Sequence, residues 1–379
     1  MRIAVPAESD PGEARVAATA ETVKKYIALG ADVVIQTGAG MKSGVPDADY
    51  AAMGATIVAD AQAAIADADI ILRVRRPSGQ DLAGAKRGAL VLAIADPYDH
   101  VEALEKLAAT GVLLFAMELM PRITRAQAMD VLSSQANLAG YRAVVDAAAE
   151  FGRAFPMMMT AAGTVPAAKV FIMGVGVAGL QAIATARRMG AIVTATDVRP
   201  ATKEQVVSLG AKFIAVEDEE FKQAETAGGY AKEMSAAYQE KQKALTAAHI
   251  AKQDVVITTA LIPGRRAPLL ITEDMVASMR PGSVIVDLAV ERGGNCALSR
   301  PGEVVVTDKG VRIIGHMNVP GRLAATASAL YARNLSAFVD TLVDKTQKAL
   351  AVNWDDDLVK ATLLTKDGGL VHPNFQKAT

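Results

Sequence analysis

Three glycines near the middle of the chain constrain its fold more than any other feature of the sequence. They stand in the run Gly174-Val175-Gly176-Val177-Ala178-Gly179, at the spacing G-x-G-x-x-G. An apolar run, Lys169 to Met173, precedes them, and a helical run, Leu180 to Met189, follows. This glycine pattern is informative when it lies between a strand and a helix. The segment therefore predicts a strand, a tight turn and a helix of a doubly wound α/β fold.

Each glycine has its own physical reason to be in this turn. Gly174 permits the tight turn, Gly176 lets the backbone approach a pyrophosphate, and Gly179 lets the helix pack closely on the strand. The helix N-terminus then faces the anion. Asp197 ends the next expected strand, where a carboxylate accepts bonds from a ribose hydroxyl and repels a 2′-phosphate. Arg199 can accommodate such a phosphate, but the acid favours NAD over NADP.

Short apolar runs alternate with helical stretches in both halves of the chain, which is the pattern of parallel sheets covered by helices. In the first half the expected strands are Ile3 to Pro6, Val33 to Thr37, Thr56 to Val58, Ile70 to Val74, Ala89 to Ile94 and Leu113 to Met117. In the second half they are Lys169 to Gly174, Ile192 to Asp197, Lys212 to Val216, Asp254 to Ala260, Ser283 to Ala289 and Val311 to Gly315. We therefore predict two Rossmann-like α/β domains with parallel sheets and the cofactor in the cleft between them.

Two long helical stretches set the expected domain boundaries. Residues 124–151 connect the first half to the second, and residues 324–350 return the chain to the first half. We therefore predict a discontinuous N-terminal α/β domain, residues 1–129 with 326–379, and an NAD(H)-binding domain, residues 130–325.

Two other segments lack the regular alternation. Residues 217–253 are charged, carry Gly228-Gly229-Tyr230 and are longer than an ordinary crossover needs, which predicts a mobile functional loop. Residues 353–379 are poorly patterned, so we expect a loosely ordered tail.

Charge and hydropathy exclude several classes of protein. The chain has 40 Lys and Arg residues against 41 Asp and Glu residues, and no block of positive charge suits a nucleic-acid backbone. No uncharged apolar run reaches the roughly 18 residues of a membrane span, and residues 2–6 resemble a strand rather than a signal peptide. Cys296 is the only cysteine, which excludes disulfides within the chain. We expect a cytoplasmic protein with no nucleic-acid partner, no metal and no direct membrane insertion.

A polar segment at the end of the first half is a second candidate site. At about 100° per residue, Gln127, Asp130 and Ser134 share one helix face, and Ser133 lies to one side of it. A segment that enters the interdomain cleft lies where a nicotinamide is expected. In a purely structural interpretation, Thr124 and Gln127 form a capping box. The residues alone leave both interpretations open.

Six segments together form a pattern that is specific to one family. They are Met117 to Phe155, Phe155 to Gly163, Gly174 to Gly179, Thr196 to Arg199, Glu225 to Lys232 and Asp287 to Asn295. Together they closely resemble the NAD(H)-binding component, the soluble portion of the alpha subunit, of proton-translocating NAD(P) transhydrogenase. The resemblance covers almost the whole chain and implies the version of this component that is made as a separate, peripheral subunit.

The resemblance implies an activity that several subunits share. The family transfers a hydride between NADH, held by this component, and NADP(H), held by another component, while a membrane component moves protons. This implies an AB-specific transhydrogenase that is catalytic only with its partner subunits. It also implies a homodimer at the cytoplasmic face of the inner membrane, attached through the NADP(H)-binding and transmembrane components.

The resemblance also assigns site residues, in four groups. Around the nicotinamide and its ribose it implies catalytic roles for Arg122, Gln127, Asp130 and Ser133, with further cofactor contacts from Ala128, Met129 and Leu132. The group at the pyrophosphate turn is Gly174, Gly176, Val177 and Gly179. The group on the adenosine side is Asp197, Val198 and Arg199. The remaining contacts are Gly229, Gln242 and Leu261, with Tyr230 at the tip of the mobile loop that closes over the nucleotide.

Direct hydride transfer explains why the sequence needs no acid-base pair. Two nicotinamide rings must be held in contact with water excluded, and polar side chains with a closing loop suffice. His100, His249, His316 and His372 are scattered, so we expect surface or structural roles for them. Cys296 has no nearby basic partner in sequence and is expected to be an inert thiol.

Two other functions fit the same fold. The chain also resembles alanine dehydrogenase, which needs an acid-base His and a substrate-binding Lys in its first domain. Here Arg75 stands in place of that Lys, Ala95-Asp96-Pro97 occupies the region of the His, and His100 is displaced. Arg15 is retained, with an expected surface or structural role. The other alternative is a module that senses NADH without chemistry, since fold alone does not fix function.

Overall fold

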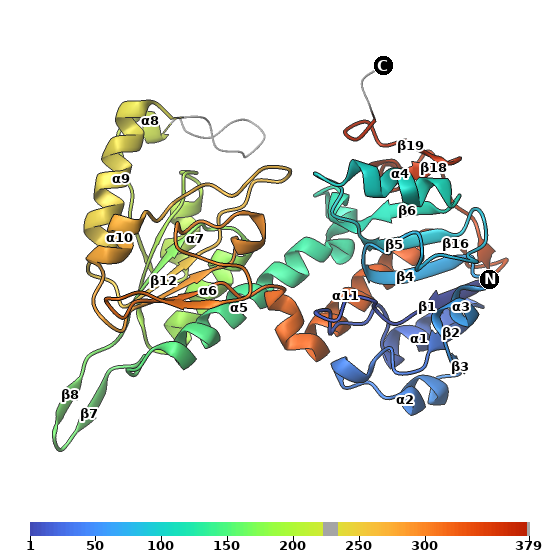
Figure 1. Cartoon of the computed structure of the whole chain (residues 1–379), viewed down its shortest axis with the longest axis horizontal. Helices are drawn as coiled ribbons and strands as arrows, with labels where there is room; N and C mark the ends of the chain where they lie inside the picture. The colour runs from blue at the N-terminus through green and yellow to red at the C-terminus, as the bar shows by residue number, and fades with distance from the viewer. Residues whose placement is uncertain (223–233, 377–379) are drawn as a thin grey trace. The chain divides into compact units, whose positions relative to one another are not determined.

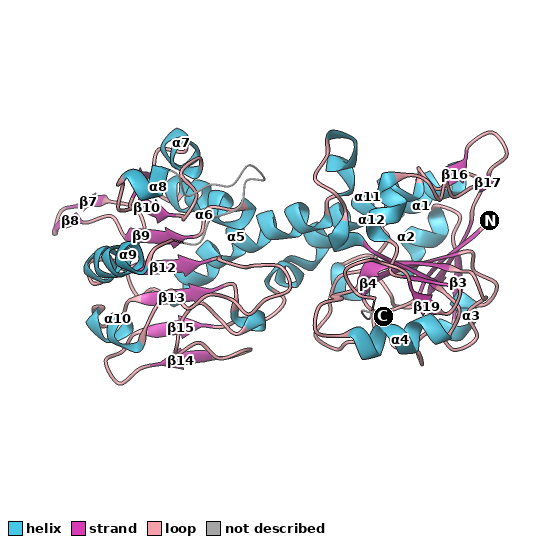
Figure 2. Ribbon diagram, turned by 90° about the horizontal axis from the view of Figure 1, so that it is seen from above, coloured by secondary structure: helices cyan, strands magenta, loops and turns pink. Residues whose placement is uncertain are grey.

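The structure is a computed structural model that describes residues 1–222 and 234–376 (Figure 1). It divides into two compact units, Met1–Gln135 with Pro320–Thr379, and Ala136–Val319. Each unit is built around its own β-sheet, which helices cover (Figure 2). The predicted α/β class with parallel, Rossmann-like sheets is confirmed.

Six parallel strands form the sheet of the first unit, in the order β3-β2-β1-β4-β5-β6. They are β1 (Arg2–Val5), β2 (Asp32–Gln36), β3 (Thr56–Val58), β4 (Ile70–Arg75), β5 (Leu90–Ile94) and β6 (Leu113–Ala116). Successive residues of a strand pack on opposite faces of the sheet. In β1, Ile3 and Val5 belong to one hydrophobic core, and Ala4 belongs to the other. The sheet is therefore buried on both faces, which explains why its strands are continuous apolar runs.

Helices and short helical turns complete the first unit. The α-helices are α1 (Ala20–Ala28), α2 (Asp47–Ala52), α3 (Ala61–Ile65), α4 (Val101–Ala109), α11 (Ala324–Val339) and α12 (Asp357–Thr362). The 3-10 helices are η1 (Met41–Ser43), η2 (Met117–Leu119), η3 (Thr124–Met129) and η5 (Val319–Leu323), the last beginning at the unit boundary.

The second unit contains a seven-stranded sheet in the order β11-β10-β9-β12-β13-β15-β14. The strands are β9 (Lys169–Met173), β10 (Ile192–Thr196), β11 (Lys212–Phe213), β12 (Val255–Thr258), β13 (Val284–Asp287), β14 (Val304–Val306) and β15 (Arg312–Ile314). The helices are α5 (Val131–Glu150), which begins in the first unit, α6 (Val177–Arg188), α7 (Thr202–Ser208), α8 (Glu219–Lys222), α9 (Ala236–Ile250), α10 (Glu273–Ser278) and η4 (Val290–Arg292).

The second sheet has one strand more than the sequence predicts. Each expected strand overlaps an observed strand, and β14 is the addition. β14 is three residues long, is largely exposed and pairs antiparallel with β15 at the edge of the sheet. Its three valines are an apolar run, but β14 joins β15 through a short hairpin rather than a helical crossover, so the strand–helix alternation that identifies the parallel strands does not mark it.

Three small antiparallel hairpins lie outside the two main sheets in the described part of the chain. They are β7 (Met158–Thr160) with β8 (Gly163–Val165), β16 (Val343–Asp344) with β17 (Ala349–Leu350), and β18 (Thr365–Lys366) with β19 (Gly369–Leu370).

The C-terminal region is more ordered than the sequence predicts. The helix expected over residues 324–350 ends at Val339, and the chain then turns into the β16–β17 hairpin. The expectation of a loose tail is wrong for residues 353–376. Asp356 caps α12 by accepting the backbone N–H of Leu358 at 2.7 Å, and Leu364 and Phe375 are buried in a core. Packing into the core of the first unit therefore orders a segment with little pattern of its own.

No helix within residues 1–222 and 234–376 is both long enough and apolar enough to cross a bilayer.

Candidate dinucleotide-binding site

The glycine-rich turn joins β9 to α6 in the second unit. Gly174 follows β9 with a φ of 101°, which favours glycine. Gly176 is extended, with φ −81° and ψ −167°, and is the N-cap of α6. α6 therefore begins at Val177, before the predicted start at Leu180. The first N–H groups of a helix have no intrahelical partner, so this turn ends in a feature that favours an anion.

The three glycines of the motif differ in what a side chain would contact. A Cβ at Gly179 would lie 1.9 Å from the carbonyl oxygen of Gly174, and a Cβ at Gly174 would lie 2.6 Å from Oγ1 of Thr259. Both positions therefore need glycine for the protein's own packing. A Cβ at Gly176 would have no protein atom within 4 Å. The open space lies where the backbone of such a turn approaches a pyrophosphate, so the residues fit the expected cofactor.

Thr259 supports this turn, although it is not among the residues expected from the sequence. Its Oγ1 donates to the carbonyl oxygen of Gly174 at 3.0 Å. Thr259 follows β12, which pairs with β9 in the sheet. The sequence shows a hydroxyl residue at the end of an expected strand. It does not show the order of the strands in the sheet, on which the contact with Gly174 depends.

Asp197 ties the turn to the end of β10. Its Oδ2 accepts the backbone N–H of Val175 at 2.7 Å, and its Oδ1 accepts the backbone N–H of Arg199 at 2.9 Å. The Arg199 guanidinium also donates to Oδ1 at 2.9 Å and to Oδ2 at 3.0 Å. The acid expected to contact the ribose is thus paired with the cation that can accommodate a 2′-phosphate.

This ion pair predicts how replacing Asp197 changes the choice between nucleotides. In Asp197→Asn the amide oxygen can still accept the N–H of Val175, but Arg199 loses a negative partner. We expect the ratio of the Kd for NADPH to the Kd for NADH to fall about tenfold, or about 1.4 kcal/mol. Fluorescence titration of both nucleotides measures the ratio, and Asp274→Asn on α10 is an exposed control. An unchanged ratio would contradict a role of the charge in selectivity.

Three exposed apolar side chains follow neighbouring strands of this sheet. Val177, Val198 and Leu261 come after β9, β10 and β12, and their exposed fractions are 36%, 53% and 51%. These strands are parallel neighbours, so their carboxyl ends meet at one edge. Exposed apolar side chains beside the turn suit the flat, weakly polar surface of an adenine ring.

Of the remaining predicted cofactor contacts in this unit, the structure describes Gln242 but not Gly229 or Tyr230. Gln242 on α9 bridges the end of β10 and the segment after β11, because its Nε2 donates to Thr196 at 3.4 Å and its Oε1 accepts the N–H of Val216 at 2.9 Å. Gly229 and Tyr230 lie outside the described residues.

The polar segment of the first unit does not form the single helix expected over residues 124–151. η3 ends at Met129, and Asp130 has a ψ of 91°, which interrupts the helical path. The Asp130 carboxylate accepts the backbone N–H of Ser133 at 2.8 Å and its hydroxyl at 2.5 Å. Asp130 therefore caps the start of α5, since an N-cap side chain accepts an N–H bond of this kind.

Two further expectations about this segment are also wrong. The helix face predicted for Gln127, Asp130 and Ser134 requires one continuous α-helix, and Ser134 instead donates to Asn334 of α11 at 2.7 Å. The capping box with Thr124 is also absent, because Ile123 is the N-cap of η3 and no side chain caps it.

The residues assigned to the nicotinamide end differ in exposure. Exposed side chains belong to Arg122, Gln127, Ala128 and Leu132. Asp130 and Ser133 are half-buried, whereas Met129 packs in the core of the first unit. Arg122, Gln127 and the Asp130–Ser133 pair therefore present polar groups that a ligand can reach.

A buried charge cluster lies beside β4 in the first unit. The Arg15 guanidinium donates to both oxygens of Glu13, at 2.8 and 2.7 Å, and to Oε1 of Gln135 at 2.8 Å. Arg75 donates to Glu13 at 2.8 Å. Arg15 is 3% exposed. It therefore has the structural role expected from the sequence rather than a free guanidinium for a substrate carboxylate.

This cluster predicts a pH-dependent contribution of Glu13 to stability. Burial opposes its ionisation, but the Arg15 and Arg75 guanidinium groups outweigh burial and hold the pKa at about 2, below the ordinary 4.5. A lowered pKa stabilises the fold above the ordinary value, and the gain is lost as pH falls toward about 2. We expect Glu13→Gln to cost roughly 2–3 kcal/mol at pH 7 and less at pH 3. Urea unfolding at both pH values measures this, and an equal loss at both would contradict it.

The loop after β5 contains residues 95–97, the region where an alanine dehydrogenase would need its acid-base His, and none of these three residues is a histidine. The backbone of this loop is unusual. Asp96 has a φ of 47°, and the carboxylate of the half-buried Glu118 accepts its N–H at 2.5 Å. Burial raises the pKa of Glu118. Arg76 donates to the carbonyl oxygens of Ala95 and Asp96, and His100 lies 3.5 Å from the Asp96 carboxylate. A local ion pair and hydrogen bonds to the backbone therefore explain the conformation of this loop.

The surroundings of Cys296, His249 and His372 fit structural rather than catalytic roles. Burial raises the pKa of Cys296 to about 11, which keeps the thiol protonated, as expected for an inert residue. His249 bonds to Thr194 at 2.8 Å, and His372 bonds to the carbonyl oxygen of Ala361 at 3.2 Å.

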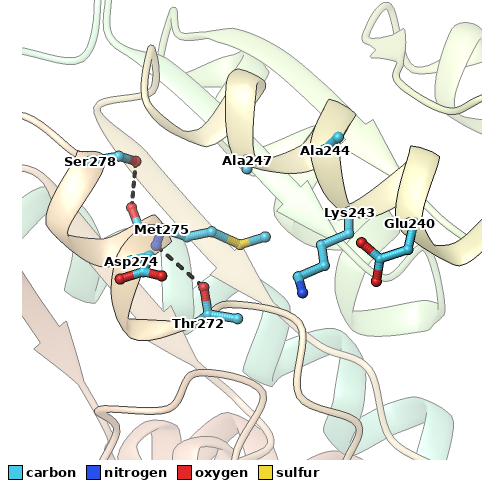
Figure 3. Close-up of a pocket in the computed structure, with 8 residues that line it drawn as sticks. All are labelled: Glu240, Lys243, Ala244, Ala247, Thr272, Asp274, Met275 and Ser278. Carbon is cyan, nitrogen blue, oxygen red and sulfur yellow. Dashed lines mark hydrogen bonds between the residues drawn. The ribbon is translucent and has the colours of Figure 1, made fainter.

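A hollow of about 310 Å³ lies between α9 and α10 (Figure 3). Ala244, Ala247 and Met275 form its apolar part, and Glu240, Lys243 and Asp274 are its charged lining residues. Among the residues that the structure describes, none of the predicted site residues lines it.

Known proteins match both halves of the chain. The family model described as the alanine dehydrogenase/PNT N-terminal domain matches residues 4–139, and the model of the C-terminal domain matches residues 143–373. A protein of Rhodospirillum rubrum that is named as the first portion of NAD(P) transhydrogenase subunit alpha is 55% identical over 98% of both chains.

Solved structures give the same result. The crystal structure of transhydrogenase from Sinorhizobium meliloti matches with a TM-score of 0.89 and 60% identity, over 98% of this chain and 100% of that chain. An L-alanine dehydrogenase structure matches with a TM-score of 0.80 and 26% identity, over 100% of this chain and 98% of that chain. The chain therefore belongs to the alanine dehydrogenase/PNT family, within its group of NAD(P) transhydrogenase alpha subunits.

Proposed function

We propose that this chain binds NAD(H) and passes hydride to NADP held by a partner component of a proton-translocating transhydrogenase. One observation carries the binding step: Gly176 leaves open space at the N-cap of α6, beside the acid Asp197. The names of the relatives support the reaction. Bound NADH would supply the hydride, which adds to the nicotinamide of oxidised NADP to give NAD and NADPH.

The residues of this chain bind and position the nucleotide in this proposal. The first turn of α6 holds the pyrophosphate, and Asp197 accepts a ribose hydroxyl. Gln127 and the Asp130–Ser133 pair orient the nicotinamide and its ribose, and Arg122 supplies positive charge nearby. No side chain takes up or releases a proton, because a hydride passes directly between two rings.

The assembly belongs to the same proposal. The chain pairs with a second copy and attaches to the cytoplasmic face of the inner membrane through an NADP(H)-binding component and a transmembrane component. Proton movement takes place in those partners, so the chain alone is expected to have little transhydrogenase activity.

Alanine dehydrogenase is the second candidate, because its structure shares the fold. Its chemistry needs a free acid-base group and a free cation for a carboxylate substrate. Here Arg15 is buried against Glu13 and Gln135, and Arg75 also binds Glu13. This closed charge cluster favours the transhydrogenase.

NADH oxidation by the purified chain separates the candidates. One mixture contains pyruvate and ammonium, and the other contains oxidised NADP and the purified NADP-binding component. We expect turnover only in the second. Turnover in the first would establish alanine dehydrogenase activity, and NADH binding without turnover in either would favour an NADH-sensing module.

A further inference from the structure

A glycine outside the motif lies where α5 closely approaches α6. A Cβ at Gly140 would lie 2.0 Å from the carbonyl oxygen of Ala178 and 3.0 Å from its Cα. Gly140 is buried within α5, and α5 and α6 run side by side in the second unit (Figures 1 and 2). Glycine weakens a helix interior relative to alanine. The close approach of α6 therefore explains why a glycine stands there.

The contact falls on the first turn of α6. Ala178 lies between Gly176, the N-cap with the open space, and Gly179, which packs on Gly174. Any displacement of the Ala178 backbone thus moves the N–H groups that face the expected pyrophosphate.

The other side of this turn is also occupied. A Cβ at Gly179 would lie 1.9 Å from the Gly174 carbonyl oxygen, and Thr259 donates to that same oxygen at 3.0 Å. Contacts with Gly174 and with Thr259 after β12 therefore also restrain this turn. One helical turn away, Asn137 of α5 donates to Gln181 of α6 at 3.3 Å, which fixes the same crossing.

We propose that Gly140 is a positioning residue for the dinucleotide, because it sets the distance between α5 and the first turn of α6. It acts through the backbone of Ala178 and does not itself contact the ligand. The inference rests on the proposed binding of NAD(H) at the glycine-rich turn.

The test compares ligands with and without a pyrophosphate. In the full chain, Gly140→Ala is expected to raise the Kd of NADH and of ADP-ribose about tenfold. The Kd of adenosine, which has no phosphate, is expected to change less than twofold. A merely structural role would weaken all three ligands by the same factor or none of them. Gly152→Ala is the matched control, since a Cβ there has no atom within 4 Å.

A second variant keeps the test valid if Gly140→Ala does not fold. Asn137→Ala removes the hydrogen bond at the same crossing and is expected to raise the Kd of NADH about threefold, again with adenosine unchanged. Unchanged NADH affinity in the folded Gly140→Ala protein would overturn the inference. Absence of NADH binding by the unsubstituted chain would instead overturn the proposed function.

Discussion

Gly176→Ala is expected to weaken NADH binding about 100-fold, or about 2.7 kcal/mol, with little effect on the stability of the nucleotide-free protein. The added Cβ contacts no protein atom within 4 Å, and the φ of −81° is ordinary for alanine. Replacing a glycine N-cap by alanine is the only local cost, of the order of several tenths of a kcal/mol. The methyl group instead fills space that the pyrophosphate needs. Fluorescence titration with NADH and thermal unfolding without nucleotide measure the two effects.

Two other glycines provide the comparison for this prediction. Gly179→Ala places a Cβ 1.9 Å from the Gly174 carbonyl oxygen, so it is expected to lower the melting temperature by several degrees as an overpacked site does. Gly152→Ala is expected to change neither stability nor binding. Equal stability losses in Gly176→Ala and Gly179→Ala would mean that the open space at Gly176 has only a structural role.

Features that depend on neighbouring residues in the chain could be predicted from the sequence. The strand, glycine turn and helix at residues 169–188 are contiguous, and each expected parallel strand is a short apolar run that a two-sided core requires. Asp197 follows from its place at the end of the next strand, and the structure shows it bonded to the turn.

Contacts between distant segments could not be predicted in this way. Thr259 and Gly140 touch the turn only because β12 pairs with β9 and α5 packs on α6. The break at Asp130 is hidden in the sequence for another reason. Its carboxylate bonds the N–H of Ser133, and a continuous helical pattern of side chains does not reveal that the backbone leaves the helix at that residue.

The cap at Asp130 sharpens the test of the nicotinamide end. Asparagine caps a helix about as well as aspartate, so Asp130→Asn retains the start of α5 while removing the charge. We expect hydride transfer to NADP on the partner component to slow roughly 100-fold, with the Kd of NADH changed less than about threefold. Gln127→Asn, which shortens an exposed side chain, is expected to act in the same direction.

The distinction between positioning and binding depends on comparing two measured quantities. Single-turnover rates with the partner component report hydride transfer, and fluorescence titration reports NADH affinity. Ser134→Ala is the matched control, because Ser134 lies in the same turn of α5 but donates to Asn334. Its hydride-transfer rate is expected to stay close to that of the unsubstituted chain. If Asp130→Asn lowers the rate and the affinity by the same factor, the carboxylate contributes binding energy to NADH throughout the reaction. If only the rate falls, it holds the ring in the geometry that the transfer requires.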